Sequence, residues 1–224
     1  MKICLITISV SKKYNILAES LIKSVYKNFL KDYDPTIFLI GDDSSLISSK
    51  DLFYKIDCLP KPLITLLRYH YILQVKEMIK DFDLIYYIDS DIEVINTVDS
   101  NDIFPNSSDE YVAVKHFWED SCKTCHLEKN KNSTAYVDKL ENYYQACFYG
   151  AFTEKFFELI EYGNQMVNND LNNNIIAKWF DESHFNKFMI DKKVKMLSPY
   201  YAYPSFEPMN SFVKMIHHNA HTKL

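Results

Sequence analysis

Residues 84–91 read LIYYIDSD, in which five apolar residues are followed directly by two aspartates, Asp89 and Asp91, with one serine between them. An unbroken apolar run of this length is typical of a strand that is buried on both faces, as in the centre of a parallel sheet. Carboxylates that follow such a strand lie at the edge where α/β sheets bind ligands. The stretch therefore predicts an α/β protein with a site at the end of this strand.

The neighbouring segments predict alternating strands and helices. Apolar spacing indicates strands at 3–8, 36–40 and 195–197, and helices at 16–30, 66–80, 154–168 and 179–189. The region 96–139 is polar, and we expect mostly long loops there. With 224 residues, of which 47% are hydrophobic and 15% aromatic, the chain can fill one core, so we expect a single domain over residues 1–224.

Charge and hydropathy exclude several classes of protein. A net charge of -5 with both signs interspersed argues against a nucleic-acid partner. The N-terminal run MKICLITISV is too short for a signal peptide or membrane span, and no other stretch predicts a transmembrane segment. The odd number of cysteines, five, indicates free thiols in a reducing compartment, so we expect a cytoplasmic protein.

One cysteine pattern has a second interpretation. Cys122, Cys125 and His126 match the spacing of a c-type haem attachment site. That attachment takes place outside the cytoplasm, so we interpret the pattern as a chance match in a polar loop.

The residues after the central strand predict a cation site. Asp89 and Asp91 can share one divalent cation, and their hard oxygen ligands suit Mn²⁺ or Mg²⁺. A cation held there would neutralise negative charge on a bound phosphate group. Arg68 is the only arginine among 25 lysines and arginines, which favours a position where its planar fork binds phosphate or carboxylate.

Six segments resemble one family in the same order. They are Thr65–His70, Leu84–Asp91, Ser133–Val137, Tyr143–Gly150, Trp179–Lys187 and Leu197–Tyr200. They resemble glycosyltransferase family 6, the retaining α1,3-galactosyl and N-acetylgalactosaminyl transferases that include the histo-blood-group ABO enzymes and their bacterial relatives. The most specific segment is DESHFNK at 181–187, which LSP follows. The resemblance implies the GT-A fold, a Rossmann-like central sheet with flanking helices.

The resemblance also implies roles for individual residues. Glu182 matches the carboxylate beside the anomeric carbon, where it acts as a nucleophile or as an ion-pair stabiliser. The implied metal ligands are Asp89 and Asp91, and the implied acceptor contacts are His116 and Trp179. The implied donor contacts are Ser9, Ser11, Tyr14, Ile64, Arg68, Asp89, Asp91, Gln145, Ala146, Cys147, Asp181 and Lys223. From the residues alone, 181–183 also fit an ordinary acidic helix start.

The sequence departs from the family pattern at three places. Phe180 stands where the family usually has histidine, and the C-terminal tail that closes over UDP in relatives is reduced to HHNAHTK. Cys147 stands where a smaller residue leaves room for an N-acetyl group, which favours galactose over N-acetylgalactosamine.

The resemblance thus implies a metal-dependent retaining transferase. It would move galactose, or alternatively N-acetylgalactosamine, from a UDP-sugar to O3 of a galactoside or fucosyl-galactoside acceptor. Two alternatives stay open: a GT-A transferase with another donor or stereochemistry, and a nucleotide-sugar or glycan-binding protein without turnover, to which Phe180 and the short tail point.

Overall fold

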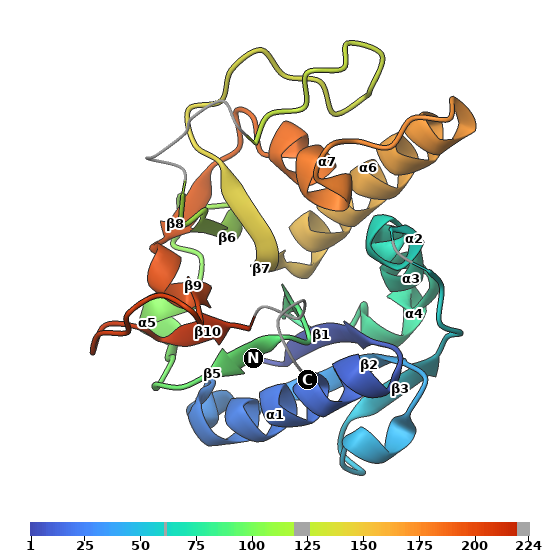
Figure 1. Cartoon of the computed structure of the whole chain (residues 1–224). Coiled ribbons are helices and arrows are strands. Elements are labelled where there is room, and N and C mark those ends of the chain that lie inside the picture. Colours follow the sequence, from blue (N-terminus) through green and yellow to red (C-terminus); the bar gives the residue numbers. More distant parts are fainter. Residues whose placement is uncertain (61, 119–125, 219–224) are drawn as a thin grey trace.

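A computed structural model describes residues 1–60, 62–118 and 126–218 (Figure 1). Its centre is a mixed sheet with the strand order β3-β2-β1-β4-β7-β6-β8. The bounds are β1 (Ile3–Ser9), β2 (Thr36–Gly41), β3 (Leu52–Lys55), β4 (Leu84–Ile88), β6 (Tyr111–Lys115), β7 (Tyr144–Phe152) and β8 (Val194–Leu197). The first four strands in this order are mutually parallel, and β7 is antiparallel to both β4 and β6. The chain direction therefore reverses between β4 and β7, next to the two aspartates.

A small second sheet joins distant parts of the chain. It has the order β5-β10-β9, with β5 at Ile92–Val94, β10 at Met215–His217 and β9 at Tyr203–Pro204. Strands β5 and β10 are antiparallel, and His217 pairs with Ile92. Because β5 begins directly after Asp91, this pairing places His217 beside the aspartates.

Helices cover both faces of the large sheet. They are α1 (Lys12–Asn28), α2 (Leu63–Leu66), α3 (Arg68–Gln74), α4 (Lys76–Ile79), α5 (Ser100–Ile103), α6 (Thr153–Asn172) and α7 (Phe180–Phe188). Alternation along β1 divides the core: Leu5 packs on the α1 side with Leu21, and Ile6 packs on the α3 and α6 side with Ile72. Figure 1 shows the long helices α1 and α6 on opposite sides of the sheet. No helix in the described part of the chain combines the length and the apolar character that a bilayer crossing needs.

The predicted α/β class is confirmed, with its central sheet and flanking helices. Strand β4 has the predicted bounds, and the other predicted strands lie within a residue of theirs. The helix expected at 66–80 is interrupted, because Leu67 and Val75 have ψ values near 10° and 7° and divide it into α2, α3 and α4. The loops expected at 96–139 are wrong for 111–115, where β6 lies between β7 and β8. Its short apolar run YVAV is surrounded by polar residues that hid it.

Candidate active site

A cleft lies at the carboxyl ends of β1 and β4. It encloses about 610 Å³, part of it open to solvent, and its lining residues are Ile8, Val10, Tyr14, Ile64, Thr65, Arg68, Tyr87, Asp89, Ser90 and Asp91. The parallel pairing of β1 with β4 brings both strand ends to one edge of the sheet. Five of the residues implied for donor binding therefore share one cleft: Tyr14, Ile64, Arg68, Asp89 and Asp91.

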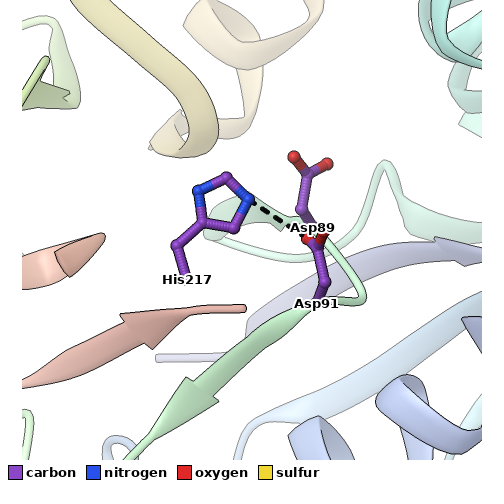
Figure 2. A group of neighbouring side chains, drawn as sticks. All are labelled: Asp89, Asp91 and His217. Carbon is purple, nitrogen blue, oxygen red and sulfur yellow. Dashed lines mark ion pairs between the residues drawn. The ribbon is translucent and has the colours of Figure 1, made fainter. Parts of the chain in front are cut away.

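Three side chains at this edge form a group that fits a divalent cation. One ligand atom from each of Asp89, Asp91 and His217 lies within 4.8 Å of the others. Figure 2 shows the His217 ring directed at the Asp91 carboxylate, with Nε2 3.4 Å from Oδ1. Carboxylate oxygens and an imidazole nitrogen are ligands of Mn²⁺ and related ions. Sequence reasoning assigned no role to His217 and missed this proximity.

Arg68 ties the first aspartate to helix α7. Its Nη2 donates to Asp89 Oδ1 at 2.8 Å, and its Nη1 lies 2.9 Å from Asp181 Oδ2. Nη1 also donates to the Ala146 carbonyl at 2.7 Å, and the guanidinium stands over the Tyr87 ring. Burial alone would lower the pKa of Arg68, but Asp181 and Asp89 raise it well above its ordinary value. The Arg68 guanidinium therefore keeps its positive charge, and this charge compensates the negative charges of Asp89 and Asp181.

The start of β7 lies beside the two aspartates, although its residues do not line the cleft. The Asp89 N–H donates to the Cys147 carbonyl at 2.8 Å, which fixes residues 145–147 against the end of β4. Gln145 contacts the His217 ring, while Ala146 offers its carbonyl to Arg68 and its N–H to Glu182. The three residues that the family resemblance placed at the donor thus sit between the cation group and α7.

Glu182 is held by two hydrogen bonds at the start of α7. Tyr143 donates its hydroxyl to Oε1 at 3.0 Å, and the Ala146 N–H donates to Oε2 at 3.0 Å. Asn186, one turn later, exchanges hydrogen bonds with both backbone groups of Tyr144 and so fixes α7 to β7. Phe180 begins the helix with φ 53°, a costly conformation for a phenylalanine and a feature typical of functional sites.

Burial changes the acidity of both carboxyl groups. It raises the pKa of Glu182 to about 7, although the bonds from Ala146 and Tyr143 work in the other direction. Burial raises the pKa of Asp181 to about 6, with Arg68 opposing the shift. No side chain caps the first turn of α7. An ordinary acidic start of a helix therefore does not explain why Asp181 and Glu182 are directed inward.

Aromatic and imidazole rings gather next to Glu182. The His116 ring lies 4.3 Å from that of His126 and 5.5 Å from that of Tyr143, the residue that donates to Glu182. His126 also contacts Trp179, at 5.9 Å between ring centroids. The two residues implied for the acceptor, His116 and Trp179, are thus joined through His126. Burial lowers the pKa of His116 to about 4, so this ring is neutral at physiological pH.

Other sequence-based expectations lie apart from the cleft or outside the described residues. Ser9 is buried and donates its hydroxyl to Asn15 Oδ1, and the Ser11 N–H donates to Asp42 Oδ2. These two serines fix the start of α1 and do not line the cleft. Lys223 and the cysteines at 122 and 125 are outside the described residues.

Comparison with known proteins identifies relatives of the whole chain. The family model for glycosyltransferase family 6 matches residues 2–224. An Escherichia coli protein, "O-antigen biosynthesis glycosyltransferase WbnI", is 27% identical over 194 residues, which are 84% of this chain and 82% of that protein.

Animal transferases match over a shorter segment. The rat "Histo-blood group ABO system transferase 2" is 36% identical over 33% of this chain and 23% of its own length. The chicken "Globoside alpha-1,3-N-acetylgalactosaminyltransferase 1" is 32% identical over 36% of this chain and 24% of its own. The family match, which covers nearly every residue, together with the α/β sheet that carries the site, shows that the chain belongs to glycosyltransferase family 6.

Proposed function

We propose that this protein is a retaining hexosyltransferase that moves galactose from UDP-galactose to O3 of a galactoside acceptor with the help of a divalent cation. The observation that supports this best is one continuous network. It runs from Asp89 through Arg68 to Ala146, and from there to the Glu182 carboxylate. The network joins a cation group to an oriented carboxylate, which are the two parts that glycosyl transfer from a nucleotide diphosphate needs.

The cleft suits the donor. Tyr14 and Ile64 line the part formed by α1 and α2, and they are proposed to contact the uridine. Asp89 and Asp91 are proposed to hold Mn²⁺ or Mg²⁺, which would neutralise charge on the diphosphate as the glycosidic bond breaks. Ser9 and Ser11 would support this wall through their bonds to Asn15 and Asp42. Lys223 is proposed as a further diphosphate contact.

Glu182 is the proposed catalytic residue. Glycosyl transfer passes through a state with positive charge on the anomeric carbon and ring oxygen, and a fixed carboxylate stabilises that charge or attacks the carbon. The bonds from Tyr143 and Ala146 hold both oxygens of Glu182 in place before the substrate arrives. Both retaining routes, through a glycosyl-enzyme or an ion pair, use this same carboxylate.

The ring cluster suits the acceptor. Trp118 and Trp179 are 39% and 44% exposed, and we propose that they offer ring surface to the C–H face of a pyranose. His116 and His126 offer ring nitrogens beside them for sugar hydroxyls. Because the cluster touches Tyr143, an acceptor bound there would lie next to Glu182.

The proposed preference for galactose rests on Cys147. This residue is buried, and its carbonyl accepts a hydrogen bond from the Asp89 N–H. The Cys147 side chain is larger than that of glycine or alanine, so we expect it to leave less room for an N-acetyl group. The globoside relatives are named for N-acetylgalactosamine transfer, so UDP-N-acetylgalactosamine is the donor to compare with UDP-galactose.

The test is UDP release from a panel of UDP-sugars with Mn²⁺, with Mg²⁺ and with EDTA. We expect one UDP-hexose to be turned over only with metal. Glu182→Gln and Asp91→Asn should lower kcat by roughly 10²-fold or more, because each removes charge that the transition state needs. Asp81→Asn and Glu19→Gln make the same chemical changes at exposed positions and should leave the rate as it is.

Two outcomes would contradict the proposal. UDP binding with metal but no turnover of any donor, with or without galactoside acceptors, would make the chain a binding protein. Turnover of a different donor, or inversion at the anomeric carbon, would make it a transferase of another specificity.

A further inference from the structure

We propose that His217 is a third protein ligand of the cation, and that Gln145 positions it by determining which ring nitrogen carries the proton. The inference rests on the proposed cation-dependent transfer, since it concerns the same site. It adds a ligand from the opposite end of the chain to the two aspartates.

Backbone pairing holds His217 at the site. It is the last residue of β10 and pairs with Ile92, which follows Asp91 directly. The next N–H, that of His218, donates to the Asp91 carbonyl at 2.8 Å. Hydrogen bonds on both sides thus fix the backbone of His217 relative to Asp91. Its Nε2 faces Asp91 Oδ1 at 3.4 Å, and the three ligand atoms lie within 4.8 Å of one another, about the span that one ion bridges (Figure 2).

Gln145 contacts the other side of the ring. Its Nε2 lies 2.8 Å from His217 Nδ1. The residue is only 9% exposed, and its Oε1 is buried without a hydrogen-bond partner among the described residues. A buried amide oxygen without a donor is uncommon in a folded protein. The Gln145 amide that contacts Nδ1 therefore carries an acceptor, Oε1, that no hydrogen bond in the described part of the chain uses.

Cation binding gives that acceptor a role. When the Gln145 amide N–H donates to Nδ1, the proton of the neutral ring is on Nε2, facing Asp91. A cation needs the lone pair of Nε2, which moves the proton to Nδ1. Nδ1–H then needs an acceptor, and a half-turn of the Gln145 amide presents Oε1 to it. An amide can serve both ring forms, and a metal-bound histidine nearly always donates its second N–H in this way.

A third ligand changes what the site binds. Two aspartates alone offer only oxygen, which suits Mg²⁺, whereas an imidazole nitrogen favours transition ions such as Mn²⁺. A site with three protein ligands is also expected to take its ion before the nucleotide arrives. We therefore expect the full chain to bind Mn²⁺ without any donor and to prefer Mn²⁺ over Mg²⁺.

Pulsed electron paramagnetic resonance of bound Mn²⁺ tests the ligand directly, with Mn²⁺ alone as the probe. We expect ¹⁴N modulation from a coordinated imidazole in the wild-type chain. His217→Ala should abolish the modulation and weaken Mn²⁺ binding by at least 10-fold. It should also reduce the ratio of the affinity for Mn²⁺ to the affinity for Mg²⁺. His218→Ala is the matched control, because His218 contacts Glu93 through its side chain while its bond to Asp91 comes from the backbone. That variant should keep the modulation.

Two changes at Gln145 test the positioning role. Leucine has a similar size but cannot accept from Nδ1–H, so Gln145→Leu should weaken Mn²⁺ binding by about 10–100-fold. Glutamate only accepts and so fixes the metal-binding form of the ring, so Gln145→Glu should bind Mn²⁺ at least as tightly as wild type. Because the added negative charge also attracts Mn²⁺, the same change is made in His217→Ala. The gain from Gln145→Glu should be smaller in that background if Gln145 acts through the ring.

The outcomes separate this inference from the proposed function. Modulation that persists in His217→Ala, or Mn²⁺ that binds only together with UDP, would overturn the inference while leaving metal-dependent transfer intact. Conversely, ¹⁴N modulation in a chain that turns over no UDP-sugar would uphold the ligand and reject the transferase. Weaker binding in Gln145→Glu than in Gln145→Leu would reject the role of Gln145.

Discussion

At Glu182 the fold keeps a carboxylate where its charge is unfavourable. Burial raises its pKa from 4.5 to about 7, so between these two values the folded protein holds a proton that the unfolded chain releases. Stability therefore falls as the pH rises through this window and stays reduced above it. The two hydrogen bonds to Glu182 limit that loss without removing it.

Replacing Glu182 should consequently stabilise the protein at alkaline pH. In Glu182→Gln, the amide oxygen still accepts from the Ala146 N–H and the amide nitrogen donates to the Tyr143 hydroxyl, so both contacts are kept without the charge. We expect the unfolding free energy at pH 8 to increase by on the order of 2 kcal/mol, with little change at pH 4. Urea unfolding at the two pH values measures this. An equal shift at both would show that burial of charge is not the cause.

The same pKa predicts a pH dependence of catalysis. Glu182 acts as a carboxylate, so kcat/KM for the donor should rise with pH and reach half its maximum near pH 7. The bond from Tyr143 lowers this pKa, so Tyr143→Phe should move the midpoint to higher pH. Steady-state rates between pH 5.5 and 8.5 provide the measurement. A flat profile, or a midpoint unaffected by Tyr143→Phe, would assign the limiting ionisation to another group.

Sequence reasoning reached some residues of the site and missed others for physical reasons. The only arginine of the chain, Arg68, was expected to bind phosphate or carboxylate, and its guanidinium bridges the carboxylates of Asp89 and Asp181. His217 gave no such signal, because its position depends on β10 pairing with β5 across more than a hundred residues. Asn186 was visible in the DESHFNK segment, but its bonds to Tyr144 appear only once α7 packs on β7.

Among the elements, long apolar strands were predictable and short ones were not. Strand β4 has five buried residues in a row, a pattern that sequence reading detects without knowing the neighbours. Strands β9 and β10 have two and three residues, and pairing with each other and with β5 defines them. The elements that complete the cation group are therefore the ones that local patterns do not encode.

The seam between β4 and β7 leaves no room for an additional side-chain atom at Gly150. A Cβ there would lie 2.2 Å from Cδ1 of the Tyr86 ring and 2.9 Å from the Ile85 carbonyl oxygen. Because Tyr86 is fully buried and donates its hydroxyl to Ile103, the ring has nowhere to move. This strand pair also positions Asp89 through its bond to Cys147.

Gly150→Ala should therefore destabilise the protein, by about 2–3 kcal/mol in chemical denaturation. The double variant Gly150→Ala/Tyr86→Leu tests the cause, because a smaller side chain at 86 removes the ring from the added methyl. Its destabilisation should be less than the sum of the two single changes. Strict additivity would show that the ring does not limit this seam.

Over the whole molecule, the site lies where two parts of the sheet meet. The parallel strands from β3 to β4 carry the cleft and the aspartates, whereas β7, α7 and β10 carry Ala146, Glu182 and His217. In addition to the strand ladder, Arg68 and the cation group form polar links across this boundary. A ligand that fills the site therefore contacts both parts. We expect its binding to raise the free energy of unfolding of the whole chain.

Donor and cation together should raise the melting temperature of the full chain. A ligand at about 100 times its dissociation constant adds roughly 2.7 kcal/mol to the folded state, which for a chain of this length corresponds to a shift of roughly 5–10 °C. We expect most of this shift with UDP and Mn²⁺ together and little with UDP and EDTA, because the diphosphate would then face Asp89 and Asp91 without compensation. Asp91→Asn should lose the metal-dependent part, while Asp81→Asn, an exposed matched change, should keep it. If UDP stabilises equally with and without EDTA, the diphosphate is held by the protein alone, and the role proposed for the two aspartates is wrong.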